Sequence, residues 1–264
     1  MDQKSYPWKI FWILYGAALV GILAVMPFLL VLFRKLPLDK PLPFSLPVLL
    51  VLQFVQSAVL LAIATGAGLW LAGKLGKGTP LLHAWLNGEK VGARARELLR
   101  VAVPAGACVG ALLLVLLRFV FVPLEPALRI VHMSDVAVWK KFLASFYGGI
   151  VEELFMRLFL LSLLVWLLLK LARLARAAVA SPGAKLFWAA NILIAILFGL
   201  GHLSSAALML PLTATVIIAA LVLNGIASLA FGYLYWTRGL ESAMVAHFTA
   251  DIILHVVGTL LFGG

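Results

Sequence analysis

The chain has 264 residues, of which 64% are hydrophobic and only 12% are charged. Soluble domains contain about one quarter charged residues, so this composition excludes an ordinary soluble protein and indicates an integral membrane protein. The net charge of +11 could suggest nucleic-acid binding, but the basic residues gather at 74–100 and 170–185, beside apolar runs. This placement is typical of topogenic charge beside anionic headgroups, so we expect membrane lipid as a partner and no nucleic acid.

The N-terminal apolar run, 10–33, is too long for the h-region of a signal peptide and lacks an A-x-A cleavage site. We therefore expect a retained first helix. Small residues in GAALVGILAV and GAGLWLAGKLG are typical of helix packing within one chain. The single cysteine, Cys108, allows no intrachain disulfide and is expected to be a packed small residue.

A helix of about 18 apolar residues or more can cross about 30 Å of hydrocarbon. The apolar runs of this chain therefore predict an all-α, polytopic transmembrane helical bundle of seven to eight helices. The expected helices are 10–33, 45–73, 99–121, 142–169, 185–203, 208–236 and 241–262. Whether 208–236 breaks at the turn-prone pair Asn224–Gly225 decides between seven and eight. We expect residues 1–141 to form N-terminal helices and amphipathic connectors, and residues 142–264 to form a catalytic core.

Three charged residues interrupt the apolar segment FYGGIVEELFMRLFLLSLLVWLLL: Glu152, Glu153 and Arg157. A charge at the centre of a membrane helix costs about 2.5 to 3.5 kcal/mol on insertion scales, so these side chains need partners or a polar cavity. Glu153 and Arg157 are four residues apart, so an ion pair on one helical face is expected. Glu152 lies about 100° around the helix and is expected to point into a cavity. Alternatively, all three form a structural salt-bridge network between helices.

Two further apolar segments contain ionisable residues. ILFGLGHLSS places His202 at the end of the fifth expected helix. MVAHFTADIILH places His247, Asp251 and His255 at successive i,i+4 positions on one face of the last helix. Together with the glutamates, these residues predict a polar site within the bundle.

The residue types of this site suit the hydrolysis of a carbonyl compound. Glu and His can act together as a general base toward water, while a second His and an Asp can stabilise an oxyanion or ligate a metal. Zn²⁺ is therefore a candidate cofactor, with Glu152, His202, His247 and Asp251 as candidate ligands. Because no Cys and no nucleophile-elbow Ser lies beside these residues, water is the expected nucleophile.

The three polar segments match E-E-x-x-x-R, F-x-x-x-H and H-x-x-x-N/D in this order, as EELFMR, FGLGH and HFTAD. The chain thereby resembles the CPBP family of CAAX prenyl proteases and bacteriocin-processing enzymes, also described as the abortive-infection family. The stretch FGYLYWTRGLESAMVAHF is similar to the segment that leads to the last motif in that family. The resemblance covers about 142–262.

The resemblance implies roles for six residues: water activation by Glu152 and His202, an oxyanion site of His247 and Asp251, and support from Glu153 and Arg157. Prenyl-protein-processing members typically have Asn at the last motif position. An anionic Asp there is a poor oxyanion donor unless it is protonated, although it could ligate a cation. His255 lies outside the motif. Family members are variously described as metalloproteases and as glutamate-dependent proteases, so the need for a metal stays open.

We expect an intramembrane endopeptidase that hydrolyses membrane-associated or lipidated, CAAX-like substrates, located in a bacterial inner membrane. A catalytically inactive immunity or scaffold protein of the same fold, binding a membrane peptide or partner, is the alternative. A proton- or cation-coupled transporter is a third, since intramembrane Glu, Asp and His also build proton relays. The chain shows no internal repeat of the transporter kind, and the complete motif set favours the enzyme.

The depth of the motif residues raises a geometric question. Basic residues favour a cytoplasmic N-terminus, which puts His202 near the outer end of its helix. A strict count of seven spans then puts His247 near the opposite face. Either 208–236 breaks at Asn224–Gly225, or the helices are short, tilted and surround a deep funnel.

Overall fold

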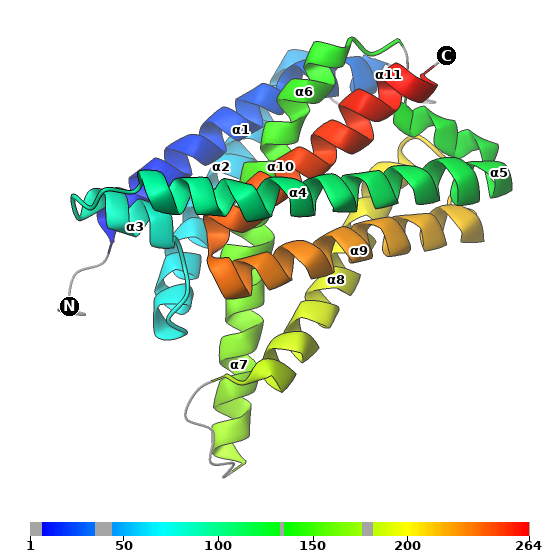
Figure 1. Cartoon of the computed structure of the whole chain (residues 1–264). Helices are drawn as coiled ribbons and strands as arrows, with labels where there is room; N and C mark the ends of the chain where they lie inside the picture. The colour runs from blue at the N-terminus through cyan, green and yellow to red at the C-terminus, as the bar shows by residue number, and fades with distance from the viewer. Residues whose placement is uncertain (1–6, 35–43, 133–134, 176–181, 264) are drawn as a thin grey trace.

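The computed structural model describes residues 7–34, 44–132, 135–175 and 182–263, and within these ranges every regular element is helical (Figure 1). The all-α prediction is confirmed. Part of the second basic cluster, 176–181, lies outside the described residues. The α-helices are α1 (Trp8–Arg34), α2 (Leu46–Lys74), α3 (Pro80–Leu86), α4 (Gly92–Leu116), α5 (Val122–Leu124), α6 (Val138–Phe146), α7 (Ser162–Leu174), α8 (Ala184–Ala207), α9 (Ala214–Arg238), α10 (Leu240–Asp251) and α11 (Gly258–Phe262).

Wider and tighter helical turns join some of these helices into longer rods. Four segments have the i→i+5 hydrogen bonds of a π-helix: η1 (Leu117–Phe121), η3 (Tyr147–Glu152), η4 (Leu154–Leu161) and η5 (Ile252–Val257). A 3₁₀ segment, η2 (Pro126–His132), follows α5. Seven rods in the described residues are long and apolar enough to span a bilayer: Trp8–Arg34, Leu46–Lys74, Gly92–Leu124, Val138–Leu174, Ala184–Ala207, Ala214–Arg238 and Leu240–Phe262.

Helix α9 runs without a break through Asn224 and Gly225, so the described chain has seven candidate spans and not eight. The Asn224 side chain turns back along the helix and donates a hydrogen bond of 2.8 Å to the carbonyl oxygen of Ala220. This satisfies the amide within an apolar bundle without opening a turn. The expected helix began too early, because 208–213 form the connector that precedes α9.

The spans are inclined to one another. In Figure 1, α4 and α9 run side by side across the molecule, whereas α7 descends steeply below them and packs against α2 and α8. The fourth span, Val138–Leu174, is the most buried of the seven, and α2 is the least. The segment with the three charges therefore lies at the centre of the bundle.

Glycines let several helices approach closely. On α4, Gly106 and Gly110 face the backbone of Ala246 and Ala250 on α10, and a Cβ at Gly110 would lie 2.7 Å from the Ala250 carbonyl oxygen. Cys108 lies on the exposed side of the same helix, so its expected packing is wrong. Because Ala246 and Ala250 each precede a motif residue, this contact fixes the position of the last motif.

The small residues of the first two helices also pack within the chain, as expected. A Cβ at Gly21 would lie 3.0 Å from Val151 Cγ2, and one at Gly68 would lie 2.9 Å from the Leu158 carbonyl oxygen. Both contacts are with the fourth span. Gly16 has open space beside it and makes no such contact.

The rod α6–η3 runs antiparallel to the rod α10–η5–α11. Near the start of the first rod, Lys141 Nζ donates a hydrogen bond of 2.6 Å to Thr259 Oγ1. At the other end, Glu153 accepts a hydrogen bond of 2.7 Å from His247. Residue numbers thus rise along one rod as they fall along the other, and these two rods form one wall of the site.

Candidate active site

The Glu153–Arg157 ion pair forms as predicted. Arg157 Nη1 lies 2.9 Å from Glu153 Oε1, and both side chains are fully buried. Arg157 Nη2 donates to the carbonyl oxygen of Ser228 on α9 at 3.3 Å, and the guanidinium lies 5.2 Å and 5.6 Å from the ring centres of Phe198 and Phe231. The pair therefore ties the fourth span to α8 and α9.

Glu153 also orients the imidazole of His247. Its Oε1 lies 2.7 Å from His247 Nδ1, and because a carboxylate only accepts hydrogen bonds, Nδ1 bears the proton. The imidazole stacks on Phe231, with ring centres 4.6 Å apart. This geometry fixes His247 with Nε2 directed at the remaining two carboxyl groups. The sequence predicted only that Glu153 pairs with Arg157.

Two carboxyl groups face His247 Nε2. Glu152 Oε2 lies 3.8 Å from it and Asp251 Oδ1 lies 3.7 Å from it, both too long for a direct hydrogen bond. The Glu152 and Asp251 side chains are 23% and 18% exposed, whereas Glu153 is fully buried. Glu152 thus takes no part in the Arg157 ion pair, so the network of all three charges does not form.

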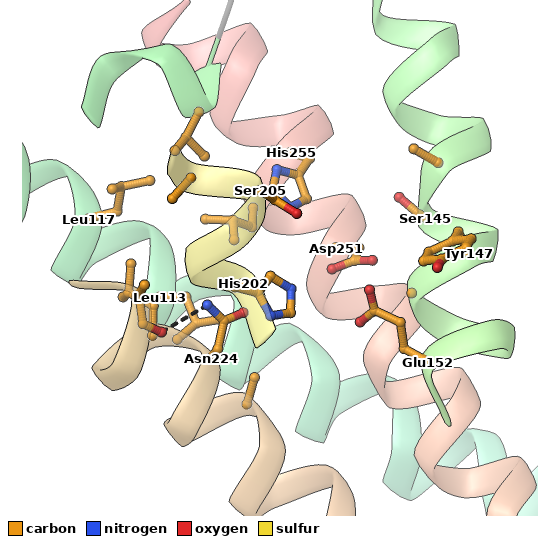
Figure 2. A pocket seen from close by; sticks show the side chains of 18 of the residues that line it. Leu113, Leu117, Ser145, Tyr147, Glu152, His202, Ser205, Asn224, Asp251 and His255 are labelled. Carbon is orange, nitrogen blue, oxygen red and sulfur yellow. Dashed lines mark hydrogen bonds between the residues drawn. The ribbon is translucent and has the colours of Figure 1, made fainter. Parts of the chain in front are cut away.

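His202 approaches the same space from α8. Its Nδ1 lies 2.8 Å from the carbonyl oxygen of Phe198, one turn earlier. Figure 2 shows its imidazole opposite Glu152 and Asp251, across a cavity of about 460 Å³. Glu152, His202, His247 and Asp251 all line this cavity, and so does His255.

The tilt of the helices answers the question of depth. Phe198, which lies about one turn deeper than His202, has its ring centre 6.2 Å from that of His247. The inclined spans surround one deep cavity, so the unbroken α9 is compatible with a shared site. The break at Asn224–Gly225 is therefore wrong, and inclined helices with an unbroken α9 bring the motif residues to one cavity.

Comparison with protein-family models matches residues 134–253 to the family described as type II CAAX prenyl endopeptidase Rce1-like. The match covers 120 of the 264 residues, so it shows a similarity of this part of the chain to the family. The matched region contains all three motifs, so the resemblance stated from the sequence is confirmed. Comparisons with curated proteins and with solved structures find no match. The Rce1-like family and the seven apolar helices together support a membrane-embedded peptidase of the CAAX-protease type.

The site has a glycine that sequence reasoning missed. A Cβ on Gly148 would collide with Asp251 Oδ2 and would lie 3.1 Å from His247 Nε2. Its neighbour Gly149 packs as closely, with a Cβ there 2.8 Å from Phe248 Cβ. The pair GG, one turn before Glu152 in a row of bulky residues, was the available signal. Only a residue without a side chain leaves room here for the last motif.

The side chains of the described residues do not form a three-ligand metal site. In the part of the chain that the structure describes, no three His, Cys, Asp or Glu side chains are placed to hold one ion. His247 Nδ1 faces Glu153, and His202 Nδ1 faces a backbone carbonyl. This arrangement does not fit a catalytic zinc site of three protein ligands.

Proposed function

We propose that this Rce1-like protein is an intramembrane endopeptidase of the glutamate-dependent type. The observation that carries the proposal is the convergence of Glu152, His247 and Asp251, from two rods, on one cavity that His202 lines from a third helix. Ionisable groups inside a membrane bundle are costly, and here they gather where the cavity can hold water. A scaffold protein would not require this convergence.

In the proposed reaction, water adds to a peptide carbonyl. Glu152 accepts a proton from the water, assisted by His202, while the water oxygen bonds to the carbonyl carbon. The carbonyl oxygen becomes an oxyanion, which His247 in its imidazolium form stabilises by donating from Nε2. The C–N bond then breaks, and the leaving nitrogen takes the proton from Glu152. Asp251 supports the oxyanion as a hydrogen-bond donor when it is protonated.

Glu153 has a positioning role in this scheme. It accepts the hydrogen bond from His247 Nδ1 and keeps Nε2 directed at the reacting group. Arg157 holds Glu153 in place through the buried ion pair. The two residues thus act through His247 and not on the substrate.

The walls of the cavity suggest the class of substrate. Beyond the polar site they are largely apolar, with Leu, Ile, Val, Phe and Met side chains from several spans. This lining suits a hydrophobic or lipidated, CAAX-like peptide that reaches the site from the bilayer. The Ala- and Leu-rich composition is compatible with a bacterial inner membrane, where we place the protein.

The test compares membranes from cells that express wild type, Glu152→Gln or His202→Ala, with mass spectrometry of protein termini as the readout. We expect new termini in wild type that vanish in both variants. Glu89→Gln and His83→Ala make the same chemical changes at exposed residues outside the cavity and should retain the termini. A wild-type sample treated with a chelator separates glutamate-dependent from metal-dependent cleavage.

The outcomes separate the enzyme from the binding protein. Loss of the same termini in both site variants, with expression unchanged, supports the proposal and identifies the substrate. If termini do not differ between wild type and Glu152→Gln while both proteins are present at equal levels, the peptidase proposal is wrong and the immunity or scaffold function becomes the better explanation.

A further inference from the structure

A second cavity adjoins the active-site cavity, between α1, α2 and the end of α8. Its volume is about 270 Å³. Five residues line both cavities: Val25, Leu29, Leu32, Tyr147 and Ser205. Figure 2 shows Tyr147 and Ser205 on opposite walls of the active-site cavity. A substrate that reaches past these two side chains therefore enters the second cavity.

The second cavity combines apolar walls with a few polar side chains. Helix α1 lines it with Ile, Val, Met, Leu and Phe side chains only. Helix α2 contributes Gln53 and Ser57, and Tyr147 and Ser205 add two hydroxyl groups. Polar side chains are costly in a membrane helix, and α2 is the least buried of the seven candidate spans. The position of Gln53 and Ser57 on this helix therefore calls for a specific role.

The carboxamide of Gln53 can make more hydrogen bonds than the one it makes within α2. Its Nε2 donates to Ser57 Oγ at 3.1 Å. A carboxamide has two N–H donors and an acceptor oxygen, so this bond leaves a donor and the acceptor for a ligand. A peptide group presents the complementary acceptor and donor. The hydrocarbon chain of a lipid presents neither, so the chemistry of Gln53 favours a peptide as the occupant.

The geometry of η3 relates this cavity to the reacting groups. Tyr147 and Glu152 are five residues apart in η3, and both line the active-site cavity. In an α-helix they would point about 140° apart, whereas i→i+5 turns bring such a pair toward one side. Five residues rise about 7.5 Å along a helix, and an extended chain advances about 3.3 to 3.6 Å per residue. About two residues of an extended substrate thus reach from Glu152 to Tyr147.

We propose that the second cavity is a subsite for an extended segment of the substrate that begins about two residues from the scissile bond. Gln53 is the specificity-determining residue of this subsite and hydrogen-bonds the main chain of the segment, while the wall of α1 packs against its apolar side chains. The family match begins at residue 134, so the walls from α1 and α2 lie outside the matched region. This inference rests on the proposed function.

The probe is a synthetic peptide copied from a site that wild type cuts and Glu152→Gln does not. It is made as a series in which one main-chain amide at a time is replaced by an ester, which removes the N–H donor. In wild type, an ester at one position about two or more residues from the cut should lower kcat/KM about 2- to 10-fold, the worth of one net hydrogen bond. In Gln53→Leu, the all-amide peptide should show the same loss, and that ester should cause no further loss. The loss should lie in KM, because this contact is made before and during the reaction.

Two variants on the same helix serve as controls. Gln56→Leu makes the same chemical change at an exposed residue that lines neither cavity, so it should keep the wild-type pattern. Ser57→Ala removes the partner of Gln53 but keeps the carboxamide, so it should retain the ester sensitivity. Leucine is a good helix former and is favoured in the membrane, so both Gln variants should insert.

Three results would overturn the inference: no ester weakens cleavage by wild type, Gln53→Leu keeps the wild-type ester sensitivity, or Gln56→Leu loses it as well. A lipid chain in this cavity would show itself as unchanged or higher rates in Gln53→Leu. The ester series in wild type stands as a test even if Gln53→Leu fails to fold. If wild type and Glu152→Gln give the same termini, the proposed function has failed before any Gln53 variant is compared, and the inference falls with it.

Discussion

Two adjacent glutamates occupy different environments in the centre of the bundle. Glu153 is fully buried between Arg157 and His247, whereas Glu152 is partly exposed in the cavity. Consecutive helical residues differ by about 100° in direction, and here that turn separates a positioning carboxylate from a cavity carboxylate. A Glu→Gln substitution should therefore mainly reduce stability at Glu153 and mainly reduce activity at Glu152.

Glu153→Gln should destabilise the protein strongly, because it leaves the buried Arg157 guanidinium without its ion pair. Breaking a buried pair by removing one partner costs about 3 to 5 kcal/mol. Thermal unfolding in detergent should show a clear fall in Tm and yield relative to wild type. Glu152→Gln, the matched control one residue earlier, should unfold close to wild type while losing activity. Equal Tm values for the two variants would contradict the positioning role.

The motif residues could be predicted from the sequence, whereas some of their contacts could not. Spacing alone predicts the Glu153–Arg157 pair, since residues four apart share a helical face. His247 and Glu153 are 94 residues apart in the chain, so their hydrogen bond depends on the register between two rods. No local pattern determines that register, so Glu153 was expected only to brace a helix.

At the scale of elements, the site depends on the close approach of η3 and α10. The π-helical hydrogen bonds of η3, η4 and η5 widen the turns next to Glu152, Arg157 and Asp251. Such π segments frequently occur at functional sites. The sequence predicted ordinary helices here, because apolar periodicity does not distinguish an i→i+4 ladder from an i→i+5 ladder.

Gly148→Ala tests this close approach. The added Cβ would collide with Asp251 Oδ2 and crowd His247 Nε2, so it should push the last motif away from Glu152. A displacement of about 1 Å in an active site can cost about 100-fold in rate. We expect a loss of that size in kcat/KM on a substrate identified from wild-type membranes, without a loss of expression.

The matched control is Gly16→Ala on α1, where a Cβ meets no atom within 4 Å. Alanine favours a helix over glycine by about 1 kcal/mol, so neither substitution weakens its helix by propensity. Gly16→Ala should therefore keep wild-type activity. Full activity of Gly148→Ala would show that the site tolerates a side chain at the contact between the two rods.

For the whole molecule, composition predicted the spans well, but it left the tilt of the helices as one of two alternatives. The thickness of the hydrocarbon sets the length of a span, and the length of each apolar run in the sequence reflects that thickness. Tilt is set by packing, such as the contact of Gly106 and Gly110 with α10, and by anchors at the interface. The sequence therefore left the shared depth of His202 and His247 as a question that only the packed bundle answers.

Seven spans with an unbroken α9 predict a specific topology. Two spans lie between the connector 208–213 and the end of α11, so Leu212 and Leu261 should face the same side of the membrane. Three spans separate Trp85 on α3 from Leu212, so Trp85 should face the opposite side. The basic cluster around α3 makes that side the cytoplasm.

The three residues are exposed, so single cysteines at these positions can be labelled in a Cys108→Ser background, which removes the native exposed thiol. An impermeant maleimide applied to intact cells should label Leu212→Cys and Leu261→Cys, and should label Trp85→Cys only after the membrane is opened. Labelling of Leu212→Cys and Leu261→Cys on opposite sides would mean that 208–236 crosses the membrane twice. In that case the cavity could not be formed by the tilted seven-span bundle, and the shared depth of His202 and His247 would need the broken helix instead.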